Sequence, residues 1–170
     1  FTTDGDLLNV ATVVSDQYVA VKRTINSANK YYIELFDEDL TLDSAVSGGA
    51  ASSHSSGHLN QKTVKVIGDG VMQADVTAGA STITFASSTS SSYQAGLDYT
   101  VTLKTLPIEP GIQGVASLKG FKKRVLEVNA FLNETQNLTI NDNTIPIRTL
   151  GTSNLDVGVP SFTGTKTLHG

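Results

Sequence analysis

Cysteine and tryptophan are absent from this 170-residue chain, and charged residues are scarce. Without cysteine the chain forms no disulfide, has no thiolate nucleophile and cannot build a cysteine-based zinc site. Charged residues make up 16% of the sequence, and 16 acidic residues outnumber 12 basic ones. A formal charge of −4 without a concentrated positive face does not suit a DNA backbone, so we expect no direct nucleic-acid binding.

Long apolar runs and catalytic signatures are also missing. No stretch approaches the roughly 20 apolar residues of a membrane-spanning helix. The first residues, Phe1 to Asp4, are unlike a signal peptide, which has a basic start and an apolar stretch. We therefore expect a soluble chain without membrane contact, cut from a longer protein. Neither a Gly-x-Ser-x-Gly elbow nor a dinucleotide-binding glycine motif occurs in its required setting, so we expect neither enzymatic activity nor a cofactor.

Two groups of residues are candidates for metal ligands. His54 and His58 are four apart, but the Ser-Ser-Gly between them argues against a helix, and no nearby glutamate supplies a general base. Asp37 to Asp39 follows a strand and offers hard oxygen ligands for calcium. The ordered Asp-x-Asp-x-Asp-Gly loop is missing there, which favours a solvated acidic turn. We predict no metal site.

In place of charged residues the chain has many serines, threonines, asparagines and glycines. All four residue types are unfavourable in helix interiors. The first part of the chain instead shows strand signals. Residues 7–25 carry β-branched residues on both sides of the turn Ser15 to Gln17, and a second turn at residues 26–30 precedes an alternating stretch at 31–36. This pattern predicts a three-stranded antiparallel meander.

A second β unit follows, with strands expected at residues 63–67, 71–77, 81–86 and 98–106. Asp69-Gly70 suits a hairpin turn, because both residues tolerate positive φ. Alternating positions predict its core: Val64, Val66, Ile83, Phe85, Val101 and Leu103. A unit of this size fits a small barrel, whose closure would remove exposed strand edges.

Two stretches of small residues, 47–57 and 87–92, are expected to be mobile surface loops, because they have little to bury. Pro107 and Pro110 are expected to end the fourth strand of the second unit, since proline cannot donate to a ladder. A link containing several glycines, residues 111–120, then leads to the C-terminal part.

The C-terminal part begins with a basic cluster, Lys119 with Lys122 to Arg124. This cluster is either the solvated start of a strand or a binding surface for an acidic neighbour. Residues 123–133 fit a helix or a strand. We favour a strand, because valine and asparagine are indifferent helix formers and residues 138–147 continue the β pattern.

A family resemblance rests on the succession of several segments. These are Glu34-Leu35-Phe36-Asp37, Leu42-Asp43-Ser44, His58-Leu59-x-x-Lys62-Thr63-Val64-x-Val66-x-x-Asp69-Gly70 and Ala95-Gly96-Leu97-Asp98-Tyr99. In order and spacing they resemble the central region of tail nozzle proteins of short-tailed bacteriophages, also called tail tubular or stabilisation proteins. The matching positions that we take as structural are His58, Leu59, Thr63, Val64, Asp69, Gly70, Gly96 and Tyr99.

The resemblance implies an all-β fold in which residues 1–46 and 111–170 form a discontinuous antiparallel sheet or sandwich domain. Residues 47–110 would be an inserted, small β-barrel-like domain. It also implies a structural virion protein of the phage tail that lines the DNA exit channel. Its expected partners are further copies in a six-fold ring, the tail adaptor and the tail fibres, although the isolated segment could be monomeric. DNA would pass without specific binding, because an acidic, hydroxyl-rich wall repels phosphate.

The alternative is a carbohydrate-binding or adhesion β-sandwich module. Such sites stack sugars on exposed aromatic rings. Aromatic residues are only 6% of the chain, and we consider Tyr31, Tyr32 and Tyr93 the only plausible platforms.

Overall fold

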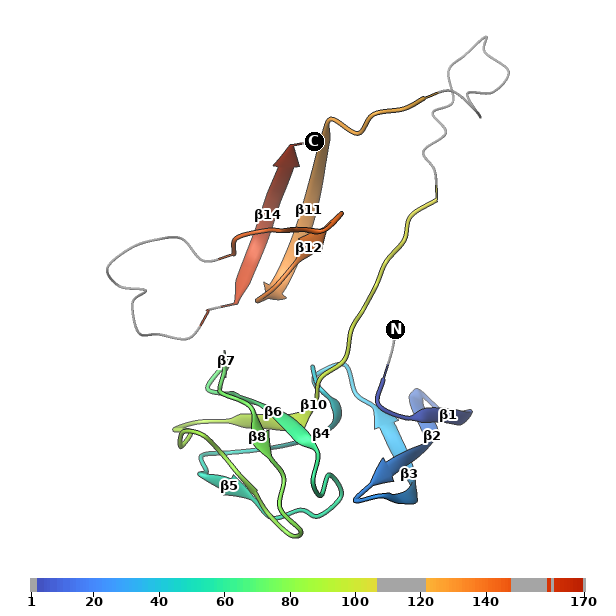
Figure 1. Cartoon of the computed structure of the whole chain (residues 1–170), viewed down its shortest axis with the longest axis vertical. Helices are drawn as coiled ribbons and strands as arrows, with labels where there is room; N and C mark the ends of the chain where they lie inside the picture. Colours follow the sequence, from blue (N-terminus) through green and yellow to red (C-terminus); the bar gives the residue numbers. More distant parts are fainter. Residues whose placement is uncertain (1–2, 107–121, 148–158, 160, 170) are drawn as a thin grey trace. The chain divides into compact units, whose positions relative to one another are not determined.

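The computed structural model describes residues 3–106, 122–147, 159 and 161–169 (Figure 1). These residues form β-strands without helices, and every strand pairing is antiparallel, which confirms the all-β prediction. Accordingly, the described part of the chain has no helix with the length and apolar character of a bilayer crossing. The residues divide into two compact units, one up to Val101 together with residue 159, and the other from Thr102 onwards.

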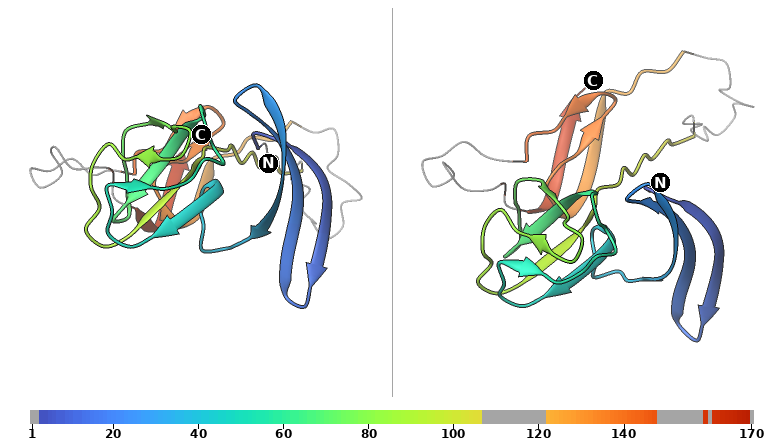
Figure 2. Two further views of the ribbon diagram at one scale, coloured as in Figure 1. Left: turned by 90° about the horizontal axis from the view of Figure 1, so that it is seen from below. Right: turned by 60° about the horizontal axis from the view of Figure 1, so that its bottom comes forward.

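The predicted meander is confirmed, but its turns are shorter than expected: they are residues 14–15 instead of 15–17, and residues 26–27 instead of 26–30. It consists of β1 (Asp6–Val13), β2 (Asp16–Ile25) and β3 (Ala28–Phe36), in the order β1-β2-β3 (Figure 1). The β2–β3 turn is made by Asn26 and Ser27, whose φ angles of 49° and 61° are typical of a tight type I′ hairpin. β3 ends opposite Gln17, so the tip of the β1–β2 hairpin extends past it (Figure 2).

The second sheet has the order β4 (Asp43–Gly48), β10 (Tyr93–Leu97), β6 (Thr63–Gly68) and β7 (Val71–Met72), and β8 (Val76–Thr77) also pairs with β6. A separate ladder joins β5 (Ser53–His54) to β9 (Ile83–Thr84). One core fills this part of the chain: Leu59, Val64, Val66, Ala78, Ile83, Phe85, Tyr93, Ala95 and Leu97. No closed barrel is detected among the described strands.

The fourth strand of this sheet was predicted in the wrong place. It is β10, at residues 93–97, and not residues 98–106, where Val101 and Leu103 are 67% and 87% exposed. β10 is central, with β4 on one side and β6 on the other. Ala95 and Gly96 are poor strand formers, but pairing on both edges and burial outweigh that local preference. The predicted core residues Val64, Val66, Ile83 and Phe85 are confirmed.

The two expected mobile loops are tied to the sheet. The first, residues 47–57, contains the end of β4 and all of β5. The second, residues 87–92, contains Thr89, whose side chain is buried. The Thr89 hydroxyl donates to the Ala51 carbonyl at 3.1 Å and accepts from the Ala51 N–H at 3.0 Å. Most other residues of both stretches are exposed, as expected of surface loops, but Thr89 fixes the two stretches to each other.

The second compact unit contains β11 (Glu127–Thr135), which pairs with β14 (Phe162–His169), and a hairpin of β12 (Thr139–Ile140) and β13 (Asn143–Thr144). The strand at β11 confirms the choice of strand over helix, whereas β14 was not anticipated. Pro107, Pro110, the link 111–120 and Lys119 lie outside the described residues.

The expected domain division remains a prediction in its main point, the return of the C-terminal strands to the meander. One detail differs. The expected boundary between residues 46 and 47 falls inside β4, which begins at Asp43 and belongs to the second sheet. The meander and the second sheet are grouped in the same compact unit.

Candidate functional site

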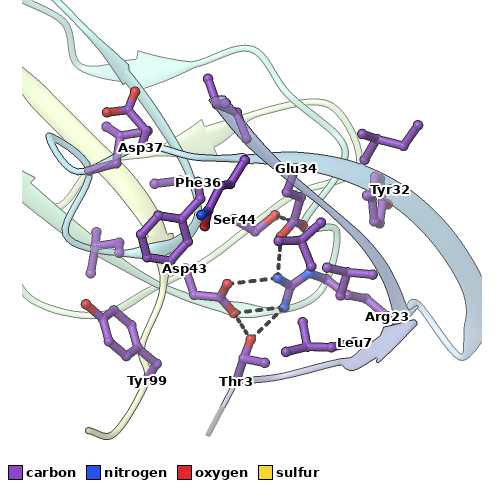
Figure 3. Close-up of a pocket in the computed structure, with 18 of the residues that line it drawn as sticks. Thr3, Leu7, Arg23, Tyr32, Glu34, Phe36, Asp37, Asp43, Ser44 and Tyr99 are labelled. Carbon is purple, nitrogen blue, oxygen red and sulfur yellow. Dashed lines mark hydrogen bonds and ion pairs between the residues drawn. The ribbon is translucent and has the colours of Figure 1, made fainter. Parts of the chain in front are cut away.

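A largely apolar groove lies within the first compact unit, along one face of the meander and the start of β4 (Figure 3). Strand pairing places Leu7, Val10, Val19, Val21 and Phe36 on the same face of the meander. The volume of the groove is about 730 Å³. Leu40, Leu42, Val46 and Tyr99 line it as well.

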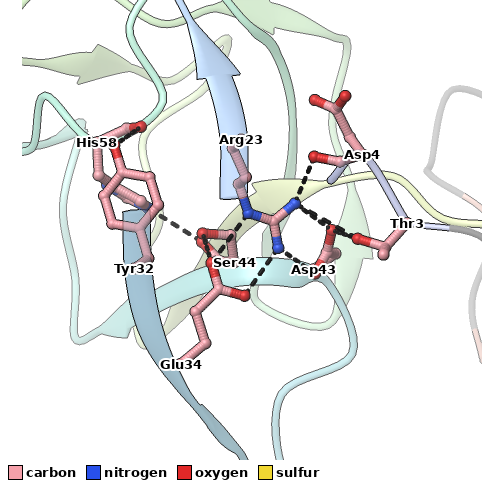
Figure 4. Close-up of polar contacts among 8 residues, drawn as sticks. All are labelled: Thr3, Asp4, Arg23, Tyr32, Glu34, Asp43, Ser44 and His58. Carbon is pink, nitrogen blue, oxygen red and sulfur yellow. Dashed lines mark hydrogen bonds and ion pairs between the residues drawn. The ribbon is translucent and has the colours of Figure 1, made fainter. Parts of the chain in front are cut away.

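Arg23 lies in this groove and is the most highly connected polar residue there (Figure 4). Its side chain is only 1% exposed. Its Nε and Nη2 donate to the two carboxylate oxygens of Glu34 at 3.0 and 2.7 Å. Its Nη2 and Nη1 donate to the two oxygens of Asp43 at 2.8 and 2.9 Å, and Nη1 also donates to the Asp4 carbonyl at 2.8 Å. The five N–H donors of the guanidinium are thus matched.

The Arg23 network links three strands, because Arg23 comes from β2, Glu34 from β3 and Asp43 from β4. Burial by itself lowers the pKa of Arg23, but the hydrogen bonds to Glu34 and Asp43 outweigh burial and raise it above its ordinary value. A guanidinium that stays charged and has no spare donor neither transfers protons nor binds an anion. Its role is to hold the meander against the second sheet.

His58 lies beside this network and is held at both ring nitrogens. Its Nε2 is 3.0 Å from the Ser44 carbonyl, and the Ser56 hydroxyl contacts its Nδ1. Because a carbonyl only accepts, Nε2 carries the proton and Nδ1 accepts from Ser56. The His58 carbonyl in turn accepts the Tyr32 hydroxyl at 3.1 Å. Both ring nitrogens of His58 are therefore occupied by contacts within the chain.

His54 and Asp37, the other candidates for metal ligands, have partners too. The Nδ1 of His54 is 2.5 Å from the Tyr93 hydroxyl. Asp37 Oδ1 accepts the Asp39 N–H at 2.9 Å, which forms a local turn. Within the described ranges, no three His, Asp or Glu side chains come together in a way that could hold a metal ion.

Of the eight positions singled out from the sequence, only His58 and Tyr99 line the groove. Leu59 and Val64 are fully buried in the core. Thr63 pairs with Thr77 in the β6–β8 ladder, and Gly70, with φ of 78°, completes the hairpin turn begun by Asp69. Asp69 and Gly96 have specific structural roles that lead to two predictions.

The β4–β10 pairing needs glycine at position 96, because the backbone of β4 passes very close to it. A Cβ at Gly96 would lie 2.8 Å from the Asp43 carbonyl oxygen and 3.0 Å from the Ala45 Cα, both of them backbone atoms. We expect Gly96→Ala to lower the free energy of unfolding by about 1–3 kcal/mol, because the strands must move apart. Urea denaturation followed by circular dichroism measures this. Gly49→Ala is the matched control, since its Cβ would be 3.8 Å from the nearest atom. Equal stability of the two variants would contradict the close approach.

Asp69 holds the loop that precedes β10. Its carboxylate accepts the backbone N–H groups of Ser90, Ser91 and Ser92 at 2.8, 2.7 and 3.1 Å, and the Ser90 hydroxyl at 3.0 Å. These backbone hydrogen bonds hold the pKa of Asp69 well below its ordinary value. Asp69 therefore combines a turn conformation, at φ of 52°, with a cap for three consecutive amides.

We expect Asp69→Asn to increase hydrogen exchange at the amides of Ser90 to Ser92 about tenfold, because the variant keeps the turn but loses a charged acceptor. Exchange followed by NMR measures this. Asp75→Asn is the control, since Asp75 pairs with Lys65 at the surface and its replacement should leave these amides unchanged. Unchanged exchange in Asp69→Asn would refute the capping role.

The same cap should depend on pH. Because the folded pKa of Asp69 is lowered, its stabilising contribution is complete well above the unfolded value of about 3.9 and is lost as the pH falls from there towards the folded pKa. The stability difference between the wild-type chain and Asp69→Asn should therefore be constant near neutral pH and shrink in acid. Denaturation at several pH values tests this, and a difference that grows in acid would contradict it.

Arg23 was missed at the level of sequence, although it carried a usable signal: Val19, Val21, Arg23 and Ile25 share one face of an alternating strand, so the charge lies in an apolar row. Asp69 was singled out as a turn residue, but its capping role carried no local signal, because the capped amides are 21 to 23 residues away.

Comparison of the chain with known protein families, curated proteins and solved structures found no match. The resemblance to tail nozzle proteins therefore stays a prediction from the sequence.

Proposed function

We propose that the chain is a structural virion protein, a segment of a phage tail nozzle wall that lines the DNA exit channel. The observation that carries the proposal is the exposure of apolar side chains on both faces of the meander. Leu7, Val10 and Phe36 on one face are 55–68% exposed, and Val13, Tyr31, Ile33 and Leu35 on the other are 49–80% exposed.

Such a sheet is unusual for a chain that acts alone. A half-solvated antiparallel sheet has one apolar face and one polar face, and large exposed apolar patches mark interaction sites. The polar groups of the groove, in contrast, are engaged with one another. This combination supports a wall element that is covered by neighbouring copies, and it gives little support to a reactive centre. The six-fold ring, the tail adaptor and the tail fibres remain the partners that the family resemblance implies.

The charge of the chain supports a channel that does not retain DNA. At a net charge of −4, the wall repels phosphate on balance. The purified chain should therefore give no complex with double-stranded DNA even at low salt, where electrostatic binding is strongest.

The decisive test is the location of the chain in particles. Mass spectrometry of purified phage particles should detect its peptides, and gold-labelled antibodies against it should bind at the tail end. Absence from purified particles, or labelling of the capsid alone, would refute the proposal.

The carbohydrate-binding alternative has one observation in its favour, the 69% exposure of Tyr31. The other two tyrosines are engaged: Tyr32 donates to His58, and Tyr93 is buried against Phe85 with its ring centroid 4.7 Å away. A glycan array separates the two functions. Binding that is lost in Tyr31→Ala would favour the alternative, whereas a nozzle wall should bind no glycan.

A further inference from the structure

The tip of the β1–β2 hairpin combines exposure with strain. Val14 is 99% exposed and has φ of 59°, which is a genuine outlier for a β-branched residue. Only the first of the two loop residues has positive φ, which is the pattern of a type II′ turn, where glycine is preferred. Strained residues of this kind cluster at functional sites. The tip therefore presents an apolar knob that folding of the chain itself does not explain.

The outer edge of β1 is less suited to contact than the tip. All eight residues of β1 are exposed, and β1 lies at the edge of the meander. The pairing of Val13 with Asp16 across a two-residue loop directs the N–H of Val10 away from β2. That N–H donates to the Asn9 side-chain oxygen at 2.8 Å, so the middle of the edge is blocked against pairing with another strand.

The groove described above is the complementary feature. Its volume of about 730 Å³ is within the range of occupied pockets. The charges of Arg23, Glu34 and Asp43 are matched to one another, so the groove offers an occupant mainly apolar contacts with Leu40, Leu42 and Phe36. It suits an uncharged, apolar turn better than a charged ligand.

The tip of the β1–β2 hairpin cannot reach the groove of its own chain. Leu7, Val10 and Val19, from the same hairpin, form part of the groove wall. Val14 is held at the far end of this hairpin by continuous pairing from Asn9 with Ala20 to Val13 with Asp16. An occupant with the chemistry of the tip must therefore come from another molecule, and a second copy of this chain carries one.

We propose that the tip of the β1–β2 hairpin, Val13 and Val14, inserts into the groove of a second copy. The copies meet head to tail, so that each gives its tip to one neighbour and receives the tip of another, which is a heterologous contact of the kind that closes into rings. This contact deepens the proposed function, on which it rests, by naming the surface through which the copies of the wall meet.

The absence of cysteine allows a direct test by disulfide cross-linking. A ¹⁵N-labelled Val14→Cys chain is mixed with unlabelled Phe36→Cys under mild oxidation, and the product of mixed mass is quantified. The control replaces Phe36→Cys with Tyr31→Cys. Phe36 and Tyr31 are 68% and 69% exposed, so cysteines at the two positions should form disulfides by random collision at similar rates. The two residues lie on opposite faces of β3. We expect about tenfold more mixed product with Phe36→Cys, because only that position lines the groove.

A second measurement follows self-association by sedimentation. Val14→Asp should weaken it about tenfold, as for a central contact residue, and Leu103→Asp, at an 87% exposed position outside the meander, should not. Equal cross-linking at Phe36 and Tyr31, or a chain that stays monomeric at every concentration, overturns the contact. If the chain self-associates and Val14→Asp has no effect, the contact is wrong while the ring survives. The proposed function is tested separately by the location of the chain in phage particles.

Discussion

Replacement of Arg23 with methionine is expected to lower the free energy of unfolding of the first compact unit by about 3–5 kcal/mol. Methionine fills much of the space of the arginine stem but leaves the carboxylates of Glu34 and Asp43, which are only 21% and 11% exposed, without a cation. Removal of one partner from a buried ionic network costs more than the network itself contributes, because the remaining charges stay desolvated. Urea denaturation followed by far-UV circular dichroism measures the change.

Lys22→Met is the matched control for this experiment. Lys22 is the neighbour of Arg23 in β2 and pairs with Asp6 at 3.0 Å, but Asp6 is 69% exposed. Exposed ion pairs of this kind contribute little, so we expect no measurable change. Arg23→Lys should still destabilise the unit, because an ammonium group cannot bridge two carboxylates with a planar fork. Equal stability of Arg23→Met and Lys22→Met would show that the network does not hold β4 to the meander.

Leu59→Ala is expected to have the second large effect, a loss of about 2–5 kcal/mol in the free energy of unfolding. Leu59 has no exposed surface and belongs to the same core cluster as Val64 and Ile83. Its truncation removes buried methyl groups and leaves a cavity that paired strands cannot easily fill. The measurement is the same urea transition.

Leu103→Ala provides the comparison, because Leu103 is 87% exposed and its truncation should change stability by less than about 0.5 kcal/mol. A loss from Leu103→Ala as large as that from Leu59→Ala would restore residues 98–106 as a core strand. A small loss from Leu59→Ala would mean that the core of the second sheet is loosely packed.

Local signals predicted the meander well. Alternating β-branched residues and short turns act within a few positions, so the order and approximate limits of β1, β2 and β3 were predicted, although β2 and β3 begin two to three residues earlier than expected. The Asp69-Gly70 hairpin followed for the same reason, since the positive φ of both residues is a local requirement. The resemblance to tail nozzle proteins named eight positions in advance, of which His58 and Tyr99 line the groove.

Features that depend on distant contacts were predicted less well. β10 contains Ala95 and Gly96, and its strand character comes from β4 and β6, which approach from far along the chain. The loops at residues 47–57 and 87–92 look flexible by composition, yet Thr89 joins them to each other. Arg23 stood in an apolar row, but its carboxylate partners, Glu34 and Asp43, are 11 and 20 residues away.

By itself, then, the sequence determined that this protein is all-β, that its first part is a three-stranded meander, and that it has no thiol chemistry. These properties follow from side-chain alternation, turn residues and composition, which act over short distances. Tertiary structure decided which strand is central, how the charge of Arg23 is neutralised, and that an apolar groove and an apolar tip occur on the same chain. Those properties depend on packing between distant segments, where burial and hydrogen-bond matching outweigh local preference.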